Sequence, residues 1–289
     1  NTVNTLQDTW TNELIGLLNT GVSFGNWAKG QLTLESHLYG DASFRFANAY
    51  PKLDLDKAMV LRKNDGRYWK KLLNHPNCDV RALAIKTLSE TKAITSQEIL
   101  DILKNSESPT VRMEAFMSLK RRADSYLPQA IRLGVEDSYE LLQRLSVQTL
   151  DENGDPALKD IYDALKDDPT VNSRVLFYIR PMRRHYYPTE KELEEYSLLN
   201  SPDHPLKEKK FTVKRERNGC NAHALDEMFK LLQNETDQEF RVAIAEVFGW
   251  YVYSYKKDEI ISRCEELLAN EKDERVANEL LKSIKRLKR

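Results

Sequence analysis

The chain has few cysteines, no long apolar run and no excess of charge of either sign. Three cysteines (Cys78, Cys220, Cys264) among 289 residues exclude a disulfide framework as the basis of the fold. No run of about 18 apolar residues is present, so the given sequence predicts no membrane span. With 44 basic and 45 acidic side chains, the net charge is −1, which argues against a surface built throughout for nucleic acid. Ten Gly and ten Pro exclude a collagen-like or low-complexity chain.

What the chain has instead is an internal repeat. Residues 80–88 are similar to 111–119 and, less clearly, to 142–150, and both steps are 31 residues long. Self-similarity at a fixed period of about 20–50 residues is typical of stacked helical repeats. Apolar residues stand at positions V, V+4 and V+8, where V is Val80, Val111 or Leu142, and this spacing favours one stripe of a helix. Later segments starting at Val171, Phe240 and Val276 fit the same frame.

The starts of these helices carry matching signals. Position V−3 holds residues that accept backbone N–H groups at a helix start, namely Asn77, Ser108, Asp168, Asp237 and Asp273. Pro109 and Pro169 stand at V−2, in the first turn, where the missing N–H costs nothing. A shorter amphipathic helix is predicted before each one, over 68–73, 97–103, 126–133, 157–165, 225–232 and 259–268. The sequence therefore predicts an all-α fold, an α-solenoid (superhelix) of about six helical hairpins.

The second helices resemble HEAT repeats, which belong to the armadillo-type α-solenoids. The likeness is carried by Asp79-Val80-Arg81, by Pro109-Thr110-Val111-Arg112 and by the segment from Asp237 to Arg241, and it covers about 66–180 and 222–289. The arginine at V+1 is replaced by Gln143, Asn172 and Ala277 in the other repeats. HEAT proteins serve as scaffolds, transport receptors, enzyme subunits and DNA-repair enzymes, so the resemblance implies a fold and leaves the function open.

Two regions lie outside the repeat. Residues 1–65 begin with a predicted helix at 6–18 and continue with aromatics among glycines, which we interpret as an aromatic-rich N-terminal cap; a small-molecule pocket is the alternative. Residues 180–222 interrupt the predicted solenoid of 66–289, and 207–217 alone contain six basic and two acidic side chains. This insertion is either a solvated loop or a basic arm for acidic partners. The arm would consist of Arg183, Arg184, Lys209, Lys210, Lys214 and Arg215.

No constellation of catalytic or metal-binding residues stands out. His75 and Cys78 form one thiol–imidazole pair at short spacing, and Cys220 and His223 form another, but about four repeats separate the two pairs, which argues against a shared zinc site. The His-Glu pairs of the di-iron HEAT hydroxylases, Gly-rich phosphate loops and the other common catalytic motifs are absent. We therefore predict no catalytic residue, no metal and no cofactor.

The side of the second helices opposite the buried stripe is the predicted binding surface. Positions V+2, V+6 and V+9 hold a mixture of charged, Met and Phe side chains that suits a protein or peptide better than a phosphate backbone. These groove residues are Lys86, Met113, Met117, Lys120, Arg144, Gln148, Phe177 and Arg180. A second candidate is an aromatic patch of Trp250, Tyr251 and Tyr253.

The sequence thus predicts a non-enzymatic scaffold that binds a protein or peptide in the concave groove. One alternative is a nucleic-acid-binding protein or HEAT-like DNA glycosylase, in which Lys120, Arg144 and Arg180 would join the basic arm. The other is a small-ligand sensor that uses the first 65 residues. The polar start at Asn1 suits a linker after a missing leader or anchor as well as an arbitrary boundary, so the compartment stays open between cytoplasmic and exported or membrane-tethered. The oligomeric state also stays open.

Overall fold

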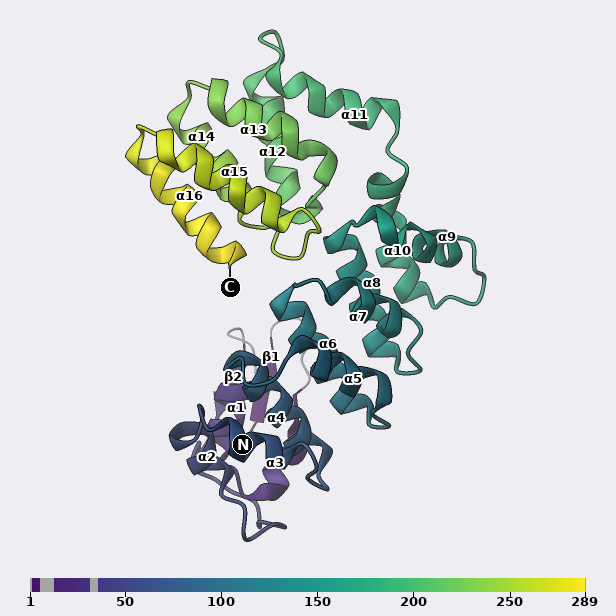
Figure 1. The fold of residues 1–289 in the computed structure, drawn as a ribbon, viewed down its shortest axis with the longest axis vertical. Coiled ribbons are helices and arrows are strands. Elements are labelled where there is room, and N and C mark those ends of the chain that lie inside the picture. Colours follow the sequence, from purple (N-terminus) through teal and green to yellow (C-terminus); the bar gives the residue numbers. More distant parts are fainter. Residues whose placement is uncertain (1, 6–12, 32–35, 289) are drawn as a thin grey trace. The chain divides into compact units, whose positions relative to one another are not determined.

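The computed structural model describes residues 2–5, 13–31 and 36–288, and it is built almost entirely of helices, as predicted (Figure 1). The chain forms two compact units, residues 1–145 and 146–289, and the boundary falls within helix α8. We call them the N-terminal unit and the C-terminal unit. The sequence did not predict this division.

The N-terminal unit contains one pair of strands and a series of helices. The strands β1 (Thr2–Thr5) and β2 (Ser36–Tyr39) pair antiparallel, with Thr2 opposite Tyr39. The helices are η1 (Ile15–Thr20), α1 (Phe24–Gln31), α2 (Leu55–Leu61), α3 (Gly66–Leu72), α4 (Cys78–Glu90), α5 (Ser96–Asn105), α6 (Pro109–Arg122), α7 (Leu127–Val135) and α8 (Glu140–Asn153).

The C-terminal unit is helical throughout the part that the structure describes. Its elements are η2 (Pro156–Leu158), α9 (Lys159–Lys166), α10 (Ser173–Tyr186), α11 (Glu190–Ser197), η3 (Leu198–Asn200), α12 (Leu206–Gly219), η4 (Ala222–Ala224), α13 (Leu225–Asn234), α14 (Gln238–Phe248), α15 (Lys257–Asn270) and α16 (Glu274–Leu287).

Each of the six predicted hairpins is present, and within each unit one pair of second helices from neighbouring hairpins lies side by side. In the N-terminal unit α4 packs on α6, and in the C-terminal unit α14 packs on α16 (Figure 1). The predicted stripe is buried: Val80, Phe240 and Val276 expose 1% of their surface or less. The helical-repeat fold therefore follows from the V, V+4, V+8 pattern, because these positions are buried where hairpins pack together within each unit.

The region 180–222 is helical, which corrects the interpretation of a solvated loop. α10 runs on to Tyr186, and α11 and α12 follow as a further pair. α12 packs on α14 in the same way as α14 packs on α16. A capping box of Thr189 and Glu192 starts α11, since each side chain accepts the other residue's backbone N–H.

Two predicted helix starts differ from the structure. The helix expected at 6–18 has residues 6–12 outside the described residues, and Ile15–Thr20 forms a 3-10 helix instead of an α-helix. The helix expected from Asp168 and Pro169 begins later, at Ser173, after the cap Asn172. The Asp168 carboxylate closes a local turn by accepting the Thr170 N–H and hydroxyl at 2.8 and 2.7 Å, so it is not available as the cap.

The turn inside most hairpins is closed by one side chain at position V−5. That side chain accepts the N–H of position V−3, at 2.8 Å from Tyr139 N to Asp137 and 2.9 Å from Asp273 N to Glu271. The residues that do this are His75, Ser106, Asp137, Glu235 and Glu271. The turn therefore requires an acceptor at V−5, and the charge of that acceptor varies.

Two of these acceptors also bind the arginine at V+1 of the preceding hairpin. Arg112 donates to Asp137 through Nε and Nη2, at 2.7 and 2.9 Å, and Arg241 donates to Glu271 at 2.5 Å. We call this contact the inter-hairpin clamp. Both members of each pair are mostly buried, with 19% of the side-chain surface exposed at most.

Candidate functional site

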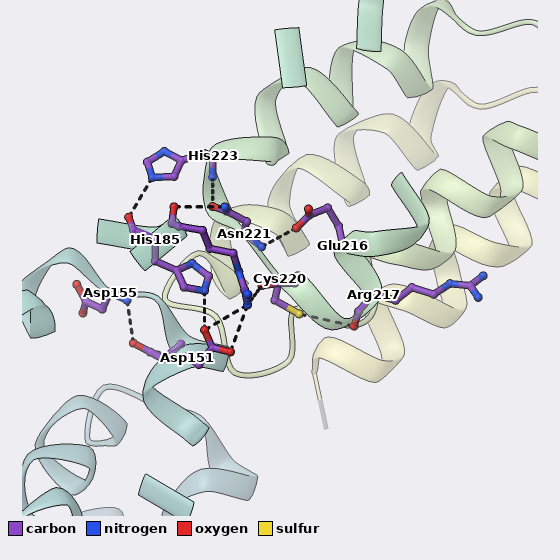
Figure 2. Close-up of polar contacts among 11 residues, drawn as sticks. Asp151, Asp155, His185, Glu216, Arg217, Cys220, Asn221 and His223 are labelled. Carbon is purple, nitrogen blue, oxygen red and sulfur yellow. Dashed lines mark hydrogen bonds and ion pairs between the residues drawn. The ribbon is translucent and has the colours of Figure 1, made fainter. Parts of the chain in front are cut away.

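The candidate site is a pocket of about 370 Å³ in the C-terminal unit. We call it the Glu216 pocket, because Glu216 on α12 is one of its lining residues. Figure 2 shows the hydrogen bond between Glu216 and Asn221. Its size is within the range of about 300–1,000 Å³ typical of small-molecule sites. The lining residues are Arg184, Glu192, Tyr196, Arg215, Glu216, Asn218, Gly219 and Asn221.

Glu216 is a buried acid, 1% exposed, whose oxygens are occupied by protein donors. The Tyr196 hydroxyl donates to Oε1 at 3.0 Å and the Asn221 N–H to Oε2 at 2.9 Å. Burial, followed by the Glu216 charge, raises the pKa of Tyr196, so this hydroxyl keeps its proton. A Cβ at Gly219 would lie 2.7 Å from Oε2, so the carboxylate needs glycine at that position.

The backbone beside Glu216 is unusual. Cys220 ends α12 in the left-handed conformation with φ +44°, which is uncommon for a residue with a side chain. Its thiol donates to the Trp250 carbonyl at 3.4 Å, and the Tyr251 hydroxyl donates to the Asn221 carbonyl at 3.2 Å. The loop after α12 is therefore held in place by contacts with the segment that follows α14.

Arg184 and His185 at the end of α10 share the carboxylate of Asp151 on α8. Figure 2 shows the contact between His185 and Asp151. Arg184 Nη2 lies 3.2 Å from both Asp151 oxygens and from the Gly219 carbonyl. His185 Nε2 lies 3.2 Å from Asp151 Oδ1, and 2% of the His185 side chain is exposed. The His223 ring donates to the His185 carbonyl at 3.1 Å. Because His185 is enclosed, it positions Asp151 rather than reaching a ligand in the pocket.

The hydrogen bonds leave an asymmetry in the Glu216 pocket. Its two carboxylates are used by protein donors, since Glu192 accepts from Thr189 and Arg183 and Glu216 from Tyr196 and Asn221. In contrast, Nε of Arg184 is buried and has no hydrogen-bond partner in the described parts of the chain. A buried donor is left over while both carboxylates already accept hydrogen bonds, and a ligand that accepts hydrogen bonds would satisfy this donor.

Cys78 and Cys220, the cysteines of the two thiol–imidazole pairs, are not arranged for nucleophilic chemistry. Burial raises the pKa of Cys220 to about 12, so its thiol stays protonated at neutral pH. His75 Nδ1 accepts the Asn77 N–H at 3.2 Å, and the Cys78 thiol donates to Asp79 at 3.5 Å. In both pairs the thiol and the imidazole therefore bond to other groups and not to each other. No cluster of three or more His, Cys, Asp or Glu that could hold a metal occurs among the described residues.

The predicted groove residues do not share one environment. In the N-terminal unit Met113 is buried, 3% exposed, which corrects its place on a surface, and Lys86 donates to the Gly30 carbonyl at 2.7 Å. Met117, Lys120 and Arg144 are half-buried. In the C-terminal unit, Gln148 donates to Glu152 at 3.2 Å, whereas Phe177 and Arg180 are exposed, Phe177 by 72%. The predicted groove positions V+2, V+6 and V+9 therefore include both buried and exposed side chains.

The aromatic patch and the basic arm are also divided. Tyr251 is fully buried, which removes it from a surface patch, while Trp250 is 46% exposed and donates to Glu246 at 2.7 Å. Tyr253 is half-buried.

Four residues of the basic arm bind carboxylates within the unit: Arg183 binds Glu192, Arg184 binds Asp151, Lys210 binds Asp237, and Arg215 binds Glu195. Lys209 is half-buried, Lys214 is exposed, and both lie on α12.

The sequence analysis missed most of the pocket. Of the lining residues it named Arg184 and Arg215 but not Tyr196, Glu216, Asn218 or Asn221. The Thr189-x-x-Glu192 capping box was the available signal that 190–219 is structured, because it marks a helix start. No sequence pattern indicated that Glu216 points inward.

Comparisons with known proteins are sparse. No protein-family model and no curated protein matches the chain. The solved structure of human deoxyhypusine hydroxylase in complex with glycerol is similar, with 16% identity over 81% of this chain and 88% of that chain, and with a TM-score of 0.34. Among the described residues, no helix is both long and apolar enough to cross a membrane.

The prediction of a non-enzymatic scaffold is corrected by this comparison, because the similar structure is that of an enzyme. At this identity and TM-score the likeness carries no argument for hydroxylase activity in this chain. The function therefore has to be argued from the chain's own sites.

Proposed function

We propose that the C-terminal unit binds an anionic small molecule, carrying a carboxylate or phosphate group, in the Glu216 pocket. The observation that carries this proposal is the buried, unpartnered Nε of Arg184 in a pocket whose carboxylates are already occupied. Arg215, which is paired with Glu195, and the exposed amide of Asn218 line the same pocket. Guanidinium groups suit carboxylate and phosphate because their fork of donors matches two oxygens.

The surroundings of Arg184 support binding through pre-organisation. Asp151 and the Gly219 carbonyl fix its Nη2, so the remaining edge of the guanidinium is held in one orientation before a ligand arrives. A fixed donor loses little conformational entropy on binding, which favours affinity.

The test is calorimetric titration of the full chain with sodium phosphate and sodium citrate, against sodium chloride at equal ionic strength. Asn218→Asp places a negative charge at the pocket without touching the Asp151 contacts, and we expect it to weaken binding about tenfold, or roughly 1.4 kcal/mol. Asn218→Ala should bind nearly as the parent does. Arg184→Gln should abolish the binding event that Asn218→Asp weakens, whereas Arg67→Gln, an exposed arginine of the N-terminal unit, is the matched control for net charge.

If neither anion binds, or if Arg184→Gln and Arg67→Gln lower the affinity equally, the pocket is not the binding site. Circular dichroism of each variant separates loss of binding from loss of fold.

We further propose that the hairpins are HEAT repeats and that residues 1–65 cap the first of them. Support comes from the inter-hairpin clamps, which use the family's arginine at V+1, and from two contacts of the N-terminal segment. The Gly16 N–H donates to Asp79 at 2.5 Å, and Lys86 donates to the Gly30 carbonyl at 2.7 Å. Deletion of residues 1–65 should therefore expose the α3/α4 hairpin and lower its protection in hydrogen exchange.

A further inference from the structure

The first hairpin has the arginine of the inter-hairpin clamp but not its acid. Arg81 on α4 stands at V+1, as Arg112 and Arg241 do. Arg112 binds Asp137, which lies 25 residues later, and the residue 25 positions after Arg81 is Ser106. Ser106 still closes its turn, since its Oγ accepts the Ser108 N–H at 3.3 Å. The hydroxyl of Ser106 carries no charge. The first hairpin therefore keeps the hydrogen bond that closes the turn but lacks a negatively charged partner for Arg81.

The guanidinium of Arg81 is left with an unsatisfied donor as a result. Its Nε is buried and makes no hydrogen bond within the described ranges. The corresponding Nε of Arg112 donates to Asp137 at 2.7 Å, and that of Arg241 donates to the Leu232 carbonyl at 3.1 Å. A buried, unsatisfied donor on a charged group is costly, which indicates that Arg81 binds a group other than the described residues.

A pocket of about 430 Å³ opens where the acid would be. Arg81 and Ser106 both line it, together with Lys70 and Asn105, over a floor that includes Ile85 and Val111. The pocket holds one carboxylate, Asp101, which accepts the Gln97 side-chain amide at 2.9 Å. Lys70 reaches Glu98 only at 3.5 Å. Two positively charged side chains and one carboxylate therefore line this pocket.

We propose that this Arg81 pocket is an oxyanion site in which Arg81 binds a phosphoryl group at the position that Asp137 occupies in the next repeat. Phosphate is the group that fits best, because it offers several acceptor oxygens to a guanidinium fork and a nearby lysine. It has two sources. One is dissolved inorganic phosphate. The other is a phosphate ester on Ser106, formed when a nucleoside triphosphate transfers its terminal phosphoryl group to Oγ, with loss of the hydroxyl proton and release of the diphosphate.

The site lies in the N-terminal unit and does not depend on the function proposed for the C-terminal unit. Its ligand is held by residues that the anion binding at the Glu216 pocket does not use. The two proposals can therefore fail separately.

The first arm of the test titrates the unmodified chain with inorganic phosphate and follows backbone amide signals of residues 105–108 by NMR. The expected result is saturable shifts that Arg81→Gln abolishes and that Arg67→Gln, on the preceding helix, leaves in place. Arg184→Gln should leave these shifts intact as well, which separates this site from the Glu216 pocket.

The second arm uses the chain with phosphoserine installed at position 106 and records its phosphorus-31 signal against pH. Pairing with Arg81 should lower the second phosphate pKa by about one unit from its ordinary value near 6, and Arg81→Gln should restore that value. Ser106→Asp should raise thermal stability in the parent and lose that gain in the Arg81→Gln variant, as a rebuilt clamp requires.

A positive first arm identifies free phosphate as the source, and a positive second arm identifies phosphoserine. If phosphate shifts no signal and the phosphoserine pKa is the same in the parent and in the Arg81→Gln variant, the proposal is overturned. If Asp101→Asn instead lowers stability only when Arg81 is present, Arg81 binds Asp101 in solution and the proposal also fails.

Discussion

The clamp between Arg112 and Asp137 should contribute strongly to the stability of the N-terminal unit. Its two hydrogen bonds are 2.7 and 2.9 Å long, and the side chains are only 13% and 9% exposed. The hydrogen bonds to Asp137 also raise the pKa of Arg112, so the guanidinium stays charged at every pH at which the protein folds. Hydrogen bonds to charged groups are worth about 1.5–3 kcal/mol each, and desolvation offsets part of that gain. We expect a coupling free energy of roughly 2–3 kcal/mol between the two side chains.

The single substitutions should be unequal. Arg112→Ala also removes donors to the Ser106 and Glu107 carbonyls, which lie 3.0 and 2.9 Å away. It should therefore cost about 3–4 kcal/mol, and Asp137→Ala, which leaves a mostly buried guanidinium unpaired, about 3 kcal/mol.

The assay is a double-mutant cycle measured by urea denaturation in a Trp250→Phe background. Trp250 lies in the C-terminal unit, whereas the buried Trp27 and Trp69 report on the N-terminal unit. Lys57 and Asp54, an exposed pair at 3.3 Å in the same unit, form the control cycle and should show no measurable coupling. A coupling for Arg112 and Asp137 as small as that of the control pair would refute the reasoning.

Three other outcomes follow from the structure. Glu216→Ala should lower the free energy of unfolding, measured in urea, by about 3–5 kcal/mol, because it leaves the Tyr196 hydroxyl and the Asn221 N–H buried without an acceptor. The control Glu208→Ala, at an exposed position, should leave it nearly unchanged. Equal effects of the two substitutions would contradict this reasoning. Burial raises the pKa of both Cys220 and Cys264 to about 12, so roughly one thiol in ten thousand is ionised at pH 8. After treatment with iodoacetamide, mass spectrometry should therefore find both cysteines unmodified until urea is added. Rapid labelling of the folded chain would show instead that the thiols are accessible. Burial lowers the pKa of His75 below 6.5, so the unfolded chain takes up the proton first as the pH falls. The stability that neutral His75 contributes is therefore present above pH 6.5 and lost below it, and the stability difference between the parent and His75→Gln should shrink over that range. A constant difference would argue against this role of His75.

The repeat was predictable because hairpin formation is local. Val80, Val111 and Phe240 mark stripes whose burial depends only on the neighbouring helices, and caps such as Asn77 and Asp273 act within a few residues. Propagation from one repeat to the next uses the same contacts each time. A pattern in the sequence therefore translated directly into packing.

The pocket and the clamps were less accessible because they join residues that are distant in sequence. Tyr196 and Glu216 are 20 residues apart and meet only because α11 and α12 form a pair. The basic composition of 207–217 suggested an exposed arm, whereas the ion pairs to Glu195 and Asp237 require the tertiary fold. Likewise, the antiparallel pairing of β1 with β2 joins two segments that are far from adjacent in the sequence.

The acceptor at V−5 gives five of the six predicted hairpins a residue with two separable requirements. The backbone turn selects for an oxygen or nitrogen that accepts an N–H, and His75, Ser106, Asp137, Glu235 and Glu271 all satisfy it. Only the contact with the preceding arginine distinguishes among them by charge. Substitution within this group can therefore strengthen or weaken individual joints between hairpins while the chain path stays the same. In protein engineering, substitutions at V−5 therefore offer a way to choose which contact between neighbouring hairpins is the least stable and unfolds first.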